Sequence, residues 1–162
     1  MLSSEITALS QRVGSLLRNR NETVAVAEGS AGGLISAALL SIPGASAYFV
    51  GGTVIYTAAA SRAWMAGEVD VPAGMRGATE DFAAWLAASV RRKVGATWGL
   101  GEAGAAGPAN PYGDPAGHTW LAVAGPSSAT KNLLTGFDDR PANMVAFAEA
   151  SLALFSEVLT AA

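Results

Sequence analysis

The groups best suited to chemistry gather at one corner of the chain, where a short apolar run ends in an acid and a serine. Residues 23–27 are typical of a buried strand, and Glu28, Ser30 and the pair Gly32-Gly33 follow directly. A strand that leads into a helix leaves backbone N–H groups free, and such groups can bind an anion. The same corner can present a hydroxyl as a nucleophile, provided that a base lies within hydrogen-bond reach.

Ser30 and His118 are the candidates for catalysis in this pattern. Ser30 is either a nucleophile or a cap of the next helix, accepting a backbone N–H near Gly33. The only lysines, Lys93 and Lys131, are distant in sequence. His118 is the sole histidine and lies beside a glycine-rich stretch. It is either a substitute general base or a polar residue at a strand end.

Two acids, Glu28 and Glu102, are expected at neighbouring strand ends. Two carboxylates in one place can bind a metal ion or share a proton. No third ligand occurs at a recognisable spacing, so the sequence predicts no metal site. We expect Glu28 to accept N–H groups of its own loop. Glu102 has no assigned role, and its charge would disfavour a phosphate close by.

Composition limits the class of protein. The chain has 162 residues, of which 51% are hydrophobic and 14% charged, which predicts one globular domain over residues 1–162. The net charge of −3, without a basic stripe, argues against nucleic acid and anionic membranes as partners. The absence of cysteine excludes disulfides and thiolate metal sites, and we expect a cytoplasmic protein. Residues 3–20 do not resemble a secretory leader, and the apolar stretch 31–40 is too short to span a bilayer.

Hydrophobic spacing predicts the elements that position these groups. Helices are expected at 4–19, with Ser3 or Ser4 as N-cap, and at 33–40, 57–66, about 80–93 after the Thr79 cap, and 142–160. Strands are expected at 23–27, 48–56, 97–101, 118–124 and 132–136, and loops at 68–75 and 104–117. This order predicts a three-layer α/β/α sandwich with a mixed sheet of about five strands. The loops 28–33 and 102–108 should then face one pocket.

Several motifs in this order resemble the CinA C-terminal domain family, whose characterised members are nicotinamide mononucleotide deamidases. The AES-x-TGG motif of that family is matched by Ala27-Glu28 and Gly32-Gly33. Further matches cover nearly the whole chain, as a standalone and divergent domain: Pro43-Gly44, Ile55-Tyr56-Thr57, residues 103–108 for TGIAGP, residues 115–120 for PVGTVW, and Asp139-Arg140 for the end of GDR.

The departures from the family pattern fall on its chemistry. The family serine taken as the nucleophile aligns with Gly29, and the lysine taken as its base aligns with Ser61. Neither side chain can perform those tasks. Other polar family positions are also small and inert here: Ala31, Ala58, Ala59 and Ala103.

The resemblance implies a site for a pyridine nucleotide or a similar small anion, with no cofactor. Its ligand-binding residues would be Glu28, Gly32, Gly33, Tyr56, Gly104, Ala106, Gly107 and Arg140. The glycines would cradle phosphate with their N–H groups or simply permit tight packing. Arg140 would hold an anionic group or pair with Asp138 or Asp139. Tyr56 would line the pocket or be only half-buried.

Three functions are compatible with this sequence. The first is a catalytically degenerate family member that keeps the fold and a nucleotide-sized pocket. The second is an active amidohydrolase with relocated groups, such as Ser30 with His118. The third is a non-catalytic interaction protein that forms a homo-oligomer.

Overall fold

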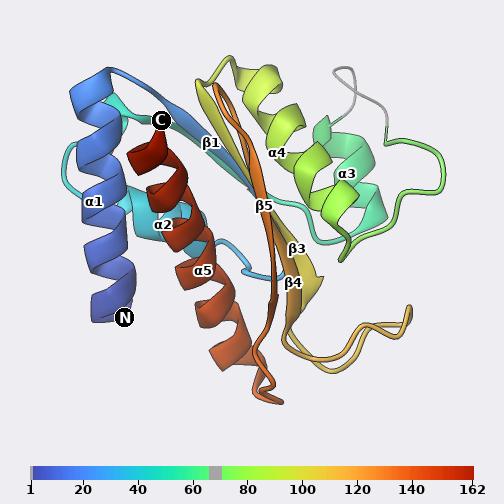
Figure 1. Cartoon of the computed structure of the whole chain (residues 1–162). Coiled ribbons are helices and arrows are strands. Elements are labelled where there is room, and N and C mark those ends of the chain that lie inside the picture. Colours follow the sequence, from blue (N-terminus) through green and yellow to red (C-terminus); the bar gives the residue numbers. More distant parts are fainter. Residues whose placement is uncertain (1, 66–70) are drawn as a thin grey trace.

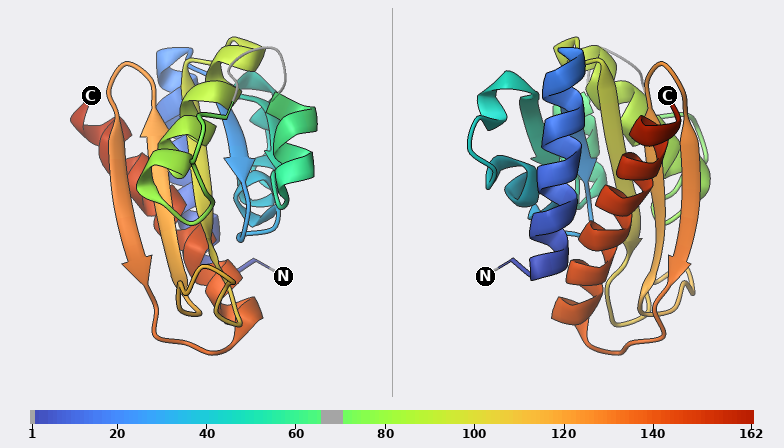
Figure 2. Two further views of the ribbon diagram at one scale, coloured as in Figure 1. Left: turned by 90° about the vertical axis from the view of Figure 1, so that its right-hand side faces the viewer. Right: turned by 60° about the vertical axis from the view of Figure 1, so that its left-hand side comes forward.

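Five strands form one sheet between two layers of helices in the computed structural model, which describes residues 2–65 and 71–162 (Figure 1). Helices α1, α2 and α5 cover one face of the sheet, and α3 and α4 cover the other (Figures 1 and 2). The predicted three-layer sandwich with a mixed sheet is confirmed. The strands are β1 (Val24–Glu28), β2 (Phe49–Val54), β3 (Trp98–Ala105), β4 (His118–Ala124) and β5 (Ala129–Leu134).

The helices begin close to where the capping residues predict. Ser3 caps α1 by accepting the backbone N–H of Ile6, and Thr79 caps α4 by accepting that of Phe82. The bounds of the helices are α1 (Ser4–Arg20), α2 (Leu34–Leu40), α3 (Ala58–Met65), α4 (Glu80–Val94) and α5 (Arg140–Ala161). A short 3₁₀ helix, η1 (Ala45–Ala47), precedes β2. Part of the expected loop 68–75, and residue 66 of the expected third helix, lie outside the described residues.

The strand order β2-β1-β3-β4-β5 determines where the loops meet. Strand β1 runs parallel to both β2 and β3, whereas β3, β4 and β5 pair antiparallel. Glu28 therefore pairs in register with Glu102 across β1 and β3. The carboxyl ends of β1, β2 and β3 share one edge of the sheet, which is the usual place for a ligand in such folds.

Strand residues alternate between the two helical layers. Val24, Val26 and Leu100 pack into the core beneath α1, α2 and α5. Ala25 and Ala27 belong to the smaller core beneath α4. On that second face a Cβ at Gly101 would lie 2.1 Å from the carbonyl oxygen of Ala83, so α4 packs directly against bare strand backbone.

Two expected strands differ from the structure by more than two residues at one end. Strand β3 continues to Ala105, although the sequence predicts a loop from residue 104, because Gly104 and Ala105 pair with Thr119 and His118 of β4. Strand β5 begins at Ala129 and ends at Leu134, earlier than the expected range 132–136. In both cases cross-strand pairing outweighs the local signals of glycine and polar residues.

Helix α5 is the one helix in the described part of the chain that is long and apolar enough to cross a membrane by length and composition. Core helices of folded domains meet the same criterion. Half of its most apolar window is buried against the rest of the protein. Phe147, Leu152 and Phe155 are fully buried in the main core.

Candidate functional site

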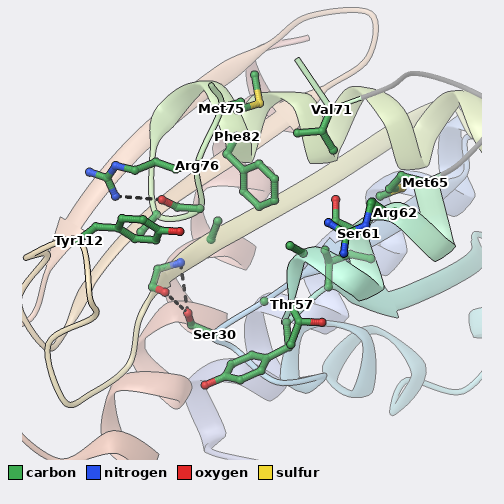
Figure 3. Close-up of a pocket in the computed structure, with 18 residues that line it drawn as sticks. Ser30, Thr57, Ser61, Arg62, Met65, Val71, Met75, Arg76, Phe82 and Tyr112 are labelled. Atoms are coloured by element: carbon green, nitrogen blue, oxygen red, sulfur yellow. Dashed lines mark hydrogen bonds between the residues drawn. The ribbon is translucent and has the colours of Figure 1, made fainter. Parts of the chain in front are cut away.

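A cavity of about 750 Å³ opens at the carboxyl ends of β1, β2 and β3 (Figure 3). Gly29 and Ser30 reach it from the first predicted loop, and Ala103 and Gly104 reach it from the second. The expectation that these two loops face one pocket is confirmed. The other described residues that line the cavity are Ile55, Tyr56, Thr57, Ala58, Ser61, Arg62, Met65, Val71, Met75, Arg76, Gly77, Ala78, Phe82 and Tyr112.

The two positions that align with the family nucleophile and base share this cavity. Gly29 follows β1, and its N–H is 3.0 Å from the carboxylate Oε2 of Glu102. Ser61 lies on α3, is 4% exposed, and its hydroxyl has no hydrogen-bond partner. Gly29 and Ser61, the two departures from the family pattern, therefore line the same cavity. Amide hydrolysis would need an attacking oxygen and a base at these two positions.

Ser30 does not cap α2. The N-cap residue of α2 is Gly33, and it makes no side-chain capping bond. The Ser30 hydroxyl donates to the carbonyl oxygen of Gly104 at 2.5 Å and accepts from the N–H of Gly104 at 3.2 Å. The serine thus fastens the loop after β1 to β3, and its proton is held by a backbone carbonyl that cannot act as a base.

Glu28 performs the capping that the sequence assigned to Ser30. Its carboxylate accepts the N–H groups of Gly33 and Ile35 at 3.0 Å each, and the N–H and hydroxyl of Ser36 at 2.9 and 2.7 Å. The prediction that Glu28 accepts N–H groups in its own loop is confirmed. Because the Gly32 N–H donates to the carbonyl of Gly29, the Gly32-Gly33 pair has no N–H group left for the predicted phosphate cradle.

Glu102 has a structural role that the sequence did not reveal. It is fully buried and accepts the N–H groups of Gly29 and Ala31 at 3.0 and 2.8 Å and the hydroxyl of Thr119 at 2.7 Å. Burial raises the pKa of Glu102 to about 7, although these hydrogen bonds act in the opposite direction. The described residues contain no cluster of metal-ligating side chains, and both glutamates use their oxygens to hold backbone.

His118 and Ser30 do not form a catalytic pair in this structure. The His118 Nε2 atom lies 3.1 Å from the carbonyl oxygen of Ala78, and Nδ1 lies 3.4 Å from the amide of Asn132. Its ring is not part of the described cavity wall. Strand β4 alternates, so Thr119 points to Glu102 and His118 points to the α4 side of the sheet, where its ring lies against the carbonyl of Ala78.

Arg140 binds Tyr56 and pairs with neither neighbouring aspartate in the described structure. Its Nη2 donates to the Tyr56 hydroxyl at 2.7 Å, and the guanidinium lies 5.8 Å from the centre of that ring. Its Nη1 donates to the carbonyl of Gly107. Of the two alternatives that the sequence left open for Arg140, the structure does not show the pairing with Asp138 or Asp139. Asp139 instead caps α5 through the N–H of Ala142.

The glycine-rich stretch after β3 serves packing more than phosphate binding. A Cβ at Gly104 would lie 2.4 Å from the carbonyl oxygen of His118, so only glycine fits between β3 and β4. The carbonyl of Ala106 accepts from Asn143 at 2.8 Å. Ala106, Gly107 and Arg140 are absent from the described cavity wall, whereas Tyr56 and Gly104 belong to it.

Sequence reasoning missed one side of the cavity. Arg76 forms an ion pair with Asp114 at 2.6 Å. Its guanidinium also lies 5.1 Å from the centre of the Tyr112 ring (Figure 3). This pairing lowers the pKa of Asp114. Asn110 supports the loop by accepting the N–H groups of Tyr112 and Asp114. The Asn-Pro-Tyr-Gly-Asp sequence is a turn signal that could have located this loop, but not its contact with Arg76.

Comparison with known proteins agrees with the fold. A family profile described as the CinA C-terminal domain matches residues 6–159. The chain is 39% identical over 119 residues to a putative competence-damage inducible protein of Desulforamulus reducens, covering 74% of this chain and 29% of that protein. It is 32% identical over 154 residues to a CinA-like protein of Desulforapulum autotrophicum, covering 94% and 36%. The chain thus spans about a third of the length of these relatives.

Solved structures share the whole arrangement of elements. The competence/damage inducible protein CihA from Agrobacterium tumefaciens superposes with a TM-score of 0.88 at 25% identity, covering 99% of this chain and 98% of that one. A CinA superfamily protein from Klebsiella pneumoniae gives a TM-score of 0.88 at 23% identity, with 97% and 99% covered.

Proposed function

The chain belongs to the CinA C-terminal domain family, and from this we propose that it binds a pyridine nucleotide without hydrolysing it. The motifs resemble those of nicotinamide mononucleotide deamidases, which release ammonia from the nicotinamide group. This chain has the fold of such a domain and a cavity at the carboxyl ends of its parallel strands. It lacks the serine and the lysine to which the family's amide chemistry is attributed.

One observation carries the proposal of lost catalysis: Gly29 and Ser61 line the same cavity. Amide hydrolysis through a covalent intermediate needs an attacking oxygen or sulfur and a base close to it. Gly29 offers no side chain, and a serine hydroxyl at position 61 cannot replace an amine as a base. Loss of a nucleophile alone lowers the rate by several powers of ten. The hydroxyl of the next residue, Ser30, donates to the carbonyl of Gly104 and accepts from its N–H.

The size and lining of the cavity support retained binding. Small-molecule sites have volumes of roughly 300–1,000 Å³ and mostly apolar walls with a few polar groups. This cavity has a volume of about 750 Å³ and combines Phe82, Met65 and Met75 with the polar groups of Thr57 and Arg62. A nucleotide with one aromatic base fits that size and composition.

The direct test measures ammonia release and binding in the same preparation. We expect nicotinamide mononucleotide to bind in a calorimetric titration and to yield no ammonia above the uncatalysed rate. Turnover comparable to that of an active relative would contradict the loss of catalysis. Absence of any binding of the amide or the acid form of the nucleotide would contradict the retained site.

Restoring the two missing groups tests whether these positions account for the loss. A Cβ at Gly29 would lie 3.2 Å from the carbonyl oxygen of Ile55, so a serine needs a shift of only a few tenths of an ångström. We expect the single variants G29S and S61K to release no ammonia, because each still lacks either the nucleophile or the base. The double variant should release ammonia measurably, and a silent, correctly folded double variant would show that other positions carry the loss.

A further inference from the structure

The cavity has an uneven distribution of charge. Its described wall contains two arginines, Arg62 and Arg76, and no carboxylate. Arg76 is neutralised by Asp114 at 2.6 Å. Arg62 forms no ion pair and no hydrogen bond with any residue that the structure describes. Among the described residues, the uncompensated positive charge therefore belongs to the α3 side of the cavity. Figure 3 shows Ser61 and Arg62 together there, at the opposite end from Arg76 and Tyr112.

The hydroxyl of Ser61 beside Arg62 is a second unused donor. Ser61 is 4% exposed, lines the cavity, and has no hydrogen-bond partner in the structure. Buried polar groups are almost always hydrogen-bonded, and an unpaired one costs free energy. A ligand that presents an acceptor to α3 would satisfy this hydroxyl and would meet the guanidinium of Arg62.

The buried acids do not oppose an anion at this place. Glu28 and Glu102 occupy the strand positions that alternate with Ala27 and Ala103, whose side chains face the α4 layer. Their carboxylates thus lie on the side of α2, with oxygens bound to the N–H groups of Ile35 and Ala31 among others. The sheet separates both charges from α3, and neither glutamate lines the cavity.

The remaining wall suits a flat apolar ring. Phe82, Met75 and Val71 lie between the two arginine ends in Figure 3, and Ile55 is a further apolar residue of the cavity wall. Aromatic faces and thioether sulfurs pack favourably against rings. The ligand that fits is therefore an aromatic ring that carries an anionic group directed to α3.

We propose that the cavity selects a pyridine nucleotide that bears a carboxylate in place of the carboxamide, with the carboxylate bound by the Ser61 hydroxyl and the Arg62 guanidinium. Both groups donate hydrogen bonds, and a guanidinium cannot accept one. A carboxylate offers two acceptor oxygens, one for each group, whereas a carboxamide has only one acceptor oxygen beside an N–H₂ group that cannot accept from Arg62. This inference rests on the proposed function. It means that the chain recognises the acid that amide hydrolysis produces rather than the amide itself.

The test compares nicotinate mononucleotide with nicotinamide mononucleotide by calorimetric titration of the full chain. The two probes differ only at the group that would face α3. We expect the acid to bind about tenfold more tightly, with a preference that declines as salt is raised, because the pair is partly exposed. R62Q should bring the two affinities within about twofold, and S61A should weaken binding of the acid more than that of the amide.

R92Q is the matched control, because it removes the same charge from an exposed position of α4 outside the described cavity wall. It should leave the preference unchanged. Equal affinity for the two nucleotides, or tighter binding of the amide, would overturn this inference and leave the proposed nucleotide site intact. Binding of neither nucleotide would overturn both. A preference that R62Q and S61A do not alter would show that α3 does not bind the carboxylate.

Discussion

At the scale of single residues, Glu102 is a fully buried carboxyl group that joins several segments. Its side chain has no solvent exposure and connects three segments, since it binds the loop after β1 through Gly29 and Ala31 and binds β4 through Thr119. The three hydrogen bonds stabilise the charged form of the carboxyl, but they do not fully offset its loss of contact with water. The pKa of Glu102 therefore rises to about 7. The carboxyl group that holds the loop after β1 is thus one that titrates near neutral pH.

The free energy of unfolding should fall as pH rises through the range of this carboxyl. The folded protein holds a proton on Glu102 up to a pKa of about 7, whereas the unfolded chain loses it near the ordinary value of 4.5. Between these values the native state binds more protons, so stability decreases with rising pH. This difference in pKa corresponds to a loss of about 3 kcal/mol in the free energy of unfolding over that pH range. Urea unfolding at pH 4.5 and pH 7.5 measures it.

E102Q should remove this part of the pH dependence, because the glutamine does not titrate. E157Q makes the same change at an exposed glutamate of α5 and should keep the wild-type slope. At each pH, the free energies of unfolding of E102Q and E157Q are therefore compared with that of the wild type. An E102Q protein with the full wild-type slope would show that the pH dependence arises elsewhere.

At the scale of elements, α2 is a short helix whose beginning depends on a strand residue. It has seven residues, and an isolated helix of that length is not stable in water. Its first N–H groups are accepted by the carboxylate of Glu28 at the end of β1. The sheet and the helix are thus joined by one side chain, which also occupies the corner that an anion could have used.

E28Q should destabilise the protein by about 3 kcal/mol, because an amide N–H₂ would face donors that now share a charged acceptor. We expect faster hydrogen exchange at Gly33, Ile35 and Ser36 than in the wild type. Exchange in α1 should change less than in α2. Unchanged stability together with unchanged exchange at these three positions would contradict the capping role.

At the scale of the whole molecule, the two edges of the sheet differ in their surroundings. Strand β2 presents Val50 and Val54 at 46% and 42% exposure, next to α2 with Leu40 at 55%. Strand β5 at the other edge exposes Leu134 but also three consecutive polar residues, Thr130, Lys131 and Asn132, and a lysine on an edge strand protects it from pairing. The β2 edge is the place where we expect a second copy of the chain to pack.

Light scattering after gel filtration should therefore show a homo-oligomer for the wild type. V54K places a charge in the apolar edge of β2 and should shift the distribution toward the monomer. L134K is the control at the β5 edge and should leave the oligomer unchanged. A monomeric wild type at tens of micromolar would contradict this expectation, and dissociation by L134K alone would assign the interface to the other edge.

The sequence by itself determined the order of layers and the place of the pocket, because hydrophobic spacing and capping residues act locally. The spacing on α1 and the Thr79 cap predicted their helices nearly to the residue. The family motifs then located Gly29 and Ser61 before any geometry was known, and the shared cavity agrees with that location.

Only the tertiary structure decided what each polar group at the corner does. Ser30, Glu28 and Glu102 bind groups that are remote in the chain or in another element, and a sequence contains no measure of those distances. The His118 ring lies against the carbonyl of Ala78 and outside the described cavity wall that Ser30 reaches, so these two side chains do not form a pair. The unpaired state of Arg62 and Ser61 also emerges only when every neighbour is in place, because pairing of a charge or a hydroxyl depends on the folded surroundings.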